Sequence, residues 1–278
     1  MSTQEPSKCC VCGEATTKRC QACAKSGIDL FFCSPEHQKL VWKYHKQVCG
    51  PNAHPFRYPP LSPEEVKLFR SNAHEFIDLS KYKDDPAIAV LPEKVMTAET
   101  YVEALSFGKK GDFQHLLQRL QKPGSVKDLT YTMGMAAARG ALSSVNAFRR
   151  SGAINFTDGT VWSHISAICA EASARAQSIE ARTSSYKFGK KLPHALCVLF
   201  ALLAARQEQS CDAVPPAWIY QALETVAECY ADIQPFPSES QAVAALGSLA
   251  DLIMPMQQLR LVGVKDRQTG KISVKCVR

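Results

Sequence analysis

Eight cysteine and histidine residues near the start of the chain have the types and the spacing of metal ligands. They form four pairs, and two or three residues separate the members of each pair. A close pair places two soft donor atoms on one short turn, and two such pairs complete a tetrahedral zinc site. The ligands therefore suffice for two closed zinc sites. The pairs are Cys9 and Cys12, Cys20 and Cys23, Cys33 and His37, and His45 and Cys49.

A disulfide framework is the alternative reading of these cysteines, and it would require an oxidising compartment. The chain opens MSTQEPSK, which lacks the apolar run of a secretion signal. We therefore expect a reducing compartment, either the cytoplasm or the nucleus or both. A catalytic zinc ion keeps one coordination position open for water, whereas four protein ligands close each of these sites. We expect two structural zinc ions that this short segment needs in order to fold.

The segment FFCSPEHQKLVWKYHKQVC, residues 31–49, resembles the second half of a MYND-type zinc finger. That family has two C-x2-C pairs, an aromatic-Cys step, a further ligand followed by Gln, a Trp and a final H-x3-C. The resemblance covers residues 9–49 and implies interleaved ligand sets, in which pairs one and three share one ion and pairs two and four share the other. The implied sets are Cys9, Cys12, Cys33 and His37 for site one, and Cys20, Cys23, His45 and Cys49 for site two.

His37 departs from the family pattern, which usually has a cysteine at this position. An imidazole nitrogen is a good zinc ligand and the spacing from Cys33 suits it, so His37 is kept in the ligand set. Cys10 is the alternative ligand if His37 points away, although one residue between Cys10 and Cys12 is poor spacing for chelation. We expect Cys10 to be an exposed thiol without a metal.

The resemblance also implies a role for the surface of the finger. Members of the family are typically protein-interaction modules that hold short proline-rich peptides in a shallow groove. Gln38 and Trp42 match positions that line this groove, and Ser34 lies nearby. An extended proline-rich peptide loses little entropy on binding and stacks on aromatic rings. Trp42 can equally be a core residue of a small domain, and both roles can hold at once.

Nucleic acid is the competing partner of a zinc finger. Lys39, Lys43 and Lys46 share one face at helical spacing. The segment lacks C2H2 spacing and a long basic stretch, and the net charge of +7 is spread along the chain. The sequence therefore argues against nucleic acid, and we expect these lysines to form a solvated helix face.

The remainder of the 278 residues is long enough for one globular domain, and its 46% hydrophobic content is ordinary for a folded protein. Residues 50–61, GPNAHPFRYPPL, are a proline-rich linker whose composition resembles fungal proteins that carry this finger. Residues 62–258 are expected to form a mainly α-helical domain, and the alternating pattern of residues 259–278 predicts a β-hairpin. The most apolar run, residues 195–205, is too short to cross a bilayer, so no membrane partner is expected.

Local signals predict several helices. Ser62 and Glu65 form a capping box, and the apolar residues from Val66 to Ile77 follow helical spacing. The segment 194–208 is apolar nearly all round, which predicts a central buried helix. Two helices on either side of Gly140, ending near residue 152, resemble the core of an ankyrin repeat. A third copy is missing, so either ordinary helical hairpins or degenerate ankyrin-like repeats fit the pattern.

The sequence beyond the finger carries none of the catalytic motifs that we considered, namely GxSxG, a P-loop or GxGxxG. Methyltransferases of the SET class also carry such fingers, but they are β-rich. His115, His164 and His194 are isolated from one another. We therefore expect a non-enzymatic adaptor. The alternatives are a transcriptional regulator that contacts nucleic acid or co-repressors through the basic finger face, and an enzyme with an unrecognised site in the helical domain.

Overall fold

The computed structural model describes residues 7–54, 56–80, 91, 93–106, 111–124, 129–144, 158–175, 189–208, 214–233, 235–246, 249 and 260–277. The chain divides into two compact units. Met1–Phe56 and Arg175–Arg278 make up the finger unit, and Arg57–Ala174 make up the middle unit. The finger and the C-terminal helices therefore lie in the same unit. No helix in the described part of the chain is long and apolar enough to cross a membrane.

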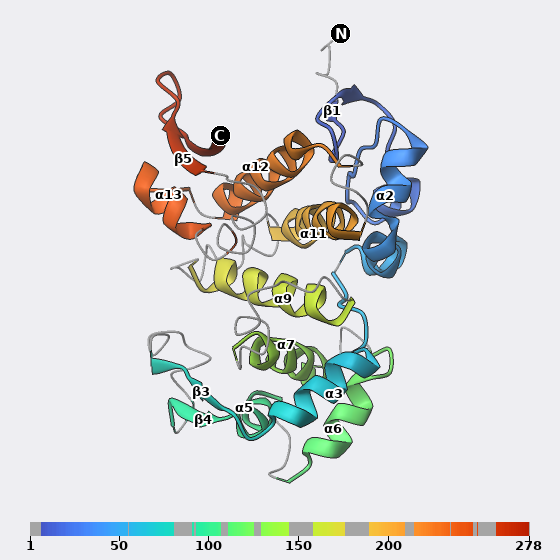
Figure 1. Ribbon diagram of the computed structural model, residues 1–278, viewed down its shortest axis with the longest axis vertical. Coiled ribbons are helices and arrows are strands. Elements are labelled where there is room, and N and C mark those ends of the chain that lie inside the picture. Colours follow the sequence, from blue (N-terminus) through green and yellow to red (C-terminus); the bar gives the residue numbers. More distant parts are fainter. Residues whose placement is uncertain are drawn as a thin grey trace. The chain divides into compact units, whose positions relative to one another are not determined.

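The middle unit begins with a helix whose start is encoded locally. Ser62 Oγ accepts a hydrogen bond from Glu65 N at 3.1 Å, and the Glu65 carboxylate accepts one from Ser62 N at 2.9 Å. This is the predicted capping box. Two short antiparallel strands and further helices follow (Figure 1). The elements are α3 (Pro63–Asn72), β3 (Phe76–Asp78), β4 (Val95–Thr97), α5 (Ala98–Leu105), α6 (Phe113–Leu120), α7 (Leu129–Ser144) and α9 (Asp158–Arg175).

The predicted helical run from Val66 to Ile77 was wrong at its end. Helix α3 ends at Asn72, and β3 pairs with β4 so that Ile77 lies opposite Met96. Period-2 alternation buries Ile77 and leaves Phe76 72% exposed, whereas a helix would have placed both on the same side. The strand partner lies well along the chain, so local periodicity could not reveal it.

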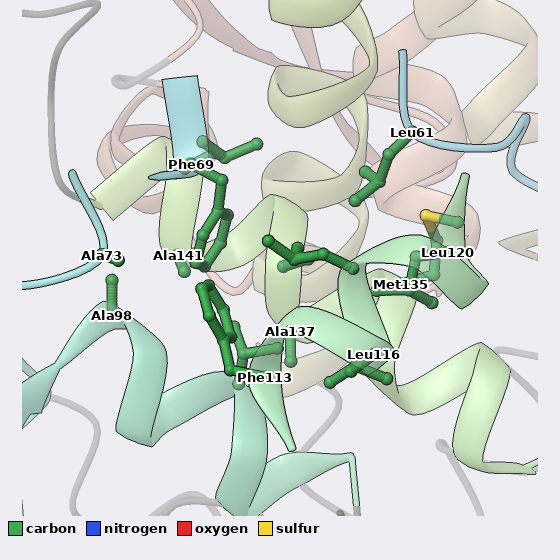
Figure 2. Close-up of a cluster of buried hydrophobic side chains, with 14 of the residues drawn as sticks. Leu61, Phe69, Ala73, Ala98, Phe113, Leu116, Leu120, Met135, Ala137 and Ala141 are labelled. Atoms are coloured by element: carbon green, nitrogen blue, oxygen red, sulfur yellow. The ribbon is translucent and has the colours of Figure 1, made fainter. Parts of the chain in front are cut away.

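A hydrophobic cluster fills the middle unit. Figure 2 shows Phe69 of α3 and Phe113 of α6 approaching each other, with a centroid separation of 5.2 Å. Met135 from α7 and Leu61 from the end of the predicted linker lie in the same cluster. The side chain of Leu61 is buried here, so the last residue of the predicted linker belongs to the core of the middle unit.

The C-terminal part of the finger unit is built around α11 (Leu192–Glu208), which lies beside α12 (Pro216–Ile233) and α2 (Pro35–His45) (Figure 1). Every residue of α11 from Leu192 to Ala205 is buried. This confirms the prediction of a central buried helix. The 3-10 turn η4 (Gly189–Lys191) precedes α11, and α13 (Glu239–Ala245) follows α12.

The predicted C-terminal β-hairpin is confirmed. Strand β5 (Arg260–Lys265) pairs antiparallel with β6 (Ile272–Val277), in a register that places Lys265 opposite Ile272. Gly270 closes the turn with a φ of 68°, a conformation that glycine adopts without steric cost. Beyond the finger, the chain is thus mainly α-helical with a terminal hairpin, as predicted. The predicted division into two helices at Gly140 was wrong, because α7 continues through Gly140 to Ser144. Residues 145–152, the rest of the second predicted helix, lie outside the described residues.

The finger itself contains two short strands, β1 (Ser7–Lys8) and β2 (Ala15–Thr16), and a short helix, α1 (Gln21–Lys25), before α2. Two 3-10 turns, η1 (Lys46–Val48) and η2 (Gly50–Asn52), follow α2. Besides the ligands of the expected zinc ions, this segment has an apolar core of its own. Val11, Ile28, Val41, Tyr44 and Val48 are at most 1% exposed.

Candidate metal centres and peptide surface

Local backbone structure holds each ligand pair. Cys9 and Cys12 lie on the turn between β1 and β2, where Gly13 N donates to Cys9 O at 2.9 Å. Cys20 precedes α1 and Cys23 lies within it. Cys33 lies two residues before α2, whereas His45 ends that helix and Cys49 follows η1. The four pairs therefore lie on separate short elements that the finger fold brings together.

Site one collects Cys9, Cys12, Cys33 and His37, whose ligand atoms all lie within 4.8 Å of one another. Cys12 Sγ lies 3.6 Å from Cys33 Sγ, and Cys9 Sγ lies 3.6 Å from His37 Nδ1. Cys33 Sγ is closer to His37 Nδ1, at 3.0 Å. The histidine therefore turns its Nδ1 atom toward the three sulfur atoms.

Site two collects Cys20, Cys23, His45 and Cys49 within the same limit of 4.8 Å. Cys49 Sγ lies 3.5 Å from Cys20 Sγ and 3.6 Å from Cys23 Sγ. His45 uses Nε2, which lies 3.5 Å from Cys20 Sγ and 3.6 Å from Cys23 Sγ. The two histidines thus present different ring nitrogens, Nδ1 for His37 and Nε2 for His45.

These separations fit a tetrahedral zinc ion. Zinc–sulfur bonds of about 2.3 Å and zinc–nitrogen bonds of about 2.05 Å give tetrahedral edges of about 3.8 Å between sulfur atoms and about 3.6 Å between sulfur and nitrogen. Separations of 3.5 and 3.6 Å in both sites lie close to these edges. The 3.0 Å separation between Cys33 Sγ and His37 Nδ1 in site one is shorter than the expected edge. Each site has four protein ligands, so a bound ion would have no open coordination position.

The charges of the ligands also bear on metal binding. Burial lowers the pKa of His45 to about 4, so its ring is neutral and its lone pair is available. Burial and the neighbouring thiols Cys12 and Cys9 raise the pKa of Cys33 to about 12. Burial alone would raise the pKa of Cys9, but backbone N–H groups lower it to about 7. Crowded thiolates repel one another, so a cation is needed to hold three of them in one site.

Cys10 lies outside both clusters. The backbone N of Cys10 donates to Phe31 O at 2.9 Å, which holds Cys10 beside the segment that precedes Cys33. Its side chain is half-buried, where we expected an exposed thiol. Burial and the neighbouring Cys9 raise the pKa of Cys10 well above its usual range, so it stays a neutral thiol. His37 therefore occupies the position at site one for which Cys10 was the alternative.

The residues expected to bind a peptide lie along α2. Trp42 is 43% exposed, and its ring stands edge-on to His45 with centroids 5.7 Å apart. Gln38 lies one turn earlier and is half-buried. Ser34 is the N-cap of α2, and its hydroxyl accepts from His37 N at 3.3 Å. The hydroxyl also hydrogen-bonds to the Glu36 carboxylate, which lowers the pKa of Glu36. Ser34 therefore has a structural role at the start of the helix.

The structure adds two residues that sequence reasoning missed. The ring of Trp218, on α12, stands edge-on to the ring of His37 with centroids 4.7 Å apart and an interplanar angle of 77°. Gln221, one turn further along α12, approaches Gly13 beside Cys12, where a Cβ atom would lie 3.0 Å from Gln221 Oε1. Nothing in the local sequence of α12 distinguishes these residues from others on an amphipathic helix.

Comparison with known families supports the reading of the finger. Residues 9–49 match the family model of the MYND finger. No curated protein and no solved structure matches the chain. The matched residues include both ligand clusters, and the resemblance implied the same interleaved sets that the structure brings together. Residues 9–49 are therefore a MYND finger, a zinc-binding module of protein–protein interaction.

Proposed function

We propose that this chain is a non-enzymatic adaptor whose MYND finger, loaded with two zinc ions, binds a short proline-rich peptide on the outer face of α2. The observation that carries this proposal is the exposure of Trp42. The neighbouring Val41 and Tyr44 are fully buried, whereas Trp42 is 43% exposed. A large indole at the surface of a matched interaction module is the aromatic platform that proline-rich peptides require.

The indole is held in place before any peptide binds. Its edge-on contact with His45, a ligand of site two, restricts the side chain, so a peptide loses less entropy in ordering it. A zinc ion bound in site two would restrict the His45 ring as one of its ligands. Peptide binding is therefore expected to depend on metal, because loss of the ion releases the ring against which Trp42 rests.

The charges near Trp42 suggest which peptides bind best. Lys39 and Lys46 are exposed on α2 and at its C-terminal end. Acidic residues beside the prolines would lie near these lysines, and such complementarity raises the association rate and the specificity. We therefore expect a proline-rich core with acidic flanks to bind more tightly than one with basic flanks.

The alternatives have less support. Lys43, the middle lysine of the basic face, forms an ion pair with Glu208 of α11 at 2.8 Å. Phosphate contacts require basic side chains that neutralise the backbone of the nucleic acid, so this pairing weakens the nucleic-acid reading. Four protein ligands in each cluster support structural rather than catalytic zinc.

The test measures binding of a fluorescein-labelled peptide with a proline-rich core and acidic flanks by fluorescence anisotropy. Trp42→Ala should weaken binding at least tenfold, since interface tryptophans commonly contribute about 2 kcal/mol or more. The matched control is Phe76→Ala, which removes another exposed aromatic side chain from the middle unit. It should leave binding unchanged. A peptide with prolines replaced by alanine should not bind.

Metal content must be measured in both variants, because a finger that loses zinc would lose the peptide for a different reason. Equal affinity in wild type and Trp42→Ala, with two zinc ions retained, would show that the finger does not use this surface. Binding of a labelled DNA duplex that falls steeply with salt, in place of peptide binding, would instead favour nucleic acid.

A further inference from the structure

Site one differs from site two in what surrounds its histidine. A ring beside His45 is that of Trp42, which lies on the same helix. The ring beside His37 is Trp218, which belongs to α12 and lies far along the chain. Both contacts are edge-on, with centroid separations of 5.7 Å and 4.7 Å respectively. Among the described residues, the ring contacts of His45 come from Phe32 and Trp42 of the finger, whereas His37 has a ring contact from the C-terminal helices.

Helix α12 touches site one at two points. Trp218 contacts His37, and Gln221 approaches Gly13, the residue after Cys12. Trp218 and Gln221 are three residues apart, so they lie on the same face of the helix. This face thus contacts the backbone turn of the first ligand pair and the histidine of the third pair, which are the two pairs that make up site one.

The finger is also fixed to the C-terminal helices away from site one. His194 Nε2, on α11, lies 3.0 Å from Ala53 O, and both residues are buried. Lys190 Nζ donates to Gly27 O at 3.3 Å, and Lys43 pairs with Glu208. These contacts hold the finger in one orientation against α11 and α12, so the approach of Trp218 to His37 follows from the packing of the whole unit.

We propose that Trp218 is a positioning residue of metal site one, which makes the metal affinity of that site depend on the packing of α12. A neighbouring group usually orients the ring of a zinc-bound histidine, and a ring that is already oriented loses less entropy when it binds the ion. Here the neighbour that orients the His37 ring is Trp218, through the edge-on ring contact. This inference rests on the metal part of the proposed function and is independent of the peptide.

Linkage makes the effect reciprocal. If α12 favours metal binding at site one, the bound metal must stabilise the packed position of α12 by the same factor. Removal of the ion from site one is therefore expected to increase hydrogen exchange in residues 216–233. Removal from site two alone should have a smaller effect there, because its histidine contacts a residue of the finger itself.

The test is a titration of the metal-free full chain with Co²⁺ against a competing chelator, followed by the absorption bands of thiolate-bound cobalt. Cys12→Ser removes a ligand of site one and so identifies which binding step belongs to that site. Trp218→Ala should weaken the site-one step roughly three- to tenfold, the usual contribution of an edge-on aromatic pair. Trp218→Phe should restore most of it, and Trp42→Ala should leave the site-one step unchanged.

Tryptophan emission gives a second readout. Co²⁺ in site one should quench Trp218, so the quenching that accompanies the site-one step should disappear in Trp218→Phe. If Trp218→Ala binds Co²⁺ at both steps with the affinity of the wild type, the positioning role of Trp218 is overturned, while the metal part of the proposed function stands. Fewer than two ions bound by the wild type overturns the metal part of the proposed function and this inference with it.

Discussion

Arg139→Met is the sharpest test of how the middle unit is held together. The Arg139 side chain is 0% exposed and that of Glu65 is 1% exposed. Arg139 Nε donates to Glu65 Oε1 at 2.8 Å, and Nη2 donates to Oε2 at 3.1 Å. The same carboxylate accepts from Ser62 N and from Ser163 Oγ, the latter at 3.4 Å. One buried carboxylate thus joins the start of α3 to α7 and α9.

Removing the arginine leaves the carboxylate buried with two weaker donors. Breaking a buried pair by removing one partner typically costs about 3–5 kcal/mol. We expect a value near the lower end, about 3 kcal/mol, because Ser62 N and the Ser163 hydroxyl still donate to Glu65. With a urea dependence of about 2 kcal/mol/M, the unfolding midpoint should fall by about 1.5 M. Methionine fills most of the arginine volume, so the cavity contribution is small.

The assay follows urea unfolding by the fluorescence of Trp162, which is 2% exposed and lies in α9 of the middle unit. Trp42→Phe and Trp218→Phe in the background leave this residue as the only indole. Arg70→Met, an exposed position on α3, is the matched control and should change stability by less than about 0.5 kcal/mol.

The double variant Glu65→Met, Arg139→Met removes both charges. Its free energy of unfolding should lie only about 1 kcal/mol below that of the wild type, because no charge is left buried without a partner. The remaining loss comes from the capping box, which disappears with Glu65. A cost below about 1 kcal/mol for Arg139→Met would refute the reasoning, since the pair would then be solvated. A double variant no more stable than the single variant would refute it as well.

Two further predictions concern packing. Phe69→Ala should destabilise the middle unit by about 3–5 kcal/mol in the same urea assay, whereas Phe76→Ala, at a position 72% exposed, should cost less than about 0.5 kcal/mol. Equal costs would contradict the assignment of Phe76 to an exposed strand face. Gly263→Ala should loosen the terminal hairpin, because its Cβ would lie 2.5 Å from Glu239 O, a backbone atom that cannot turn away. We expect a loss of about 1–3 kcal/mol and faster hydrogen exchange in β6, while Val262→Ala on the exposed face should show neither change.

The features that could be predicted from the sequence are local. The ligand pairs are close in the chain, and each lies on a short turn or helix end, so residue type and spacing indicate the metal chemistry directly. The capping box of Ser62 and Glu65, the apolar helix α11 and the alternating hairpin also depend on near neighbours. The assembly of four pairs into two interleaved sites came from the family resemblance, which records an arrangement that spacing alone leaves open.

The tertiary structure decided everything that joins distant segments. The helical spacing near Phe76 was misleading because pairing with β4 overrides it. Glu65 and Arg139 lie on separate helices, so no local sequence pattern predicts that they form an ion pair. Trp218 and Gln221 reach site one for the same reason. Short-range hydrogen bonds and ligand spacing are fixed by neighbours in the chain, whereas side-chain packing depends on which surfaces meet when the whole chain folds.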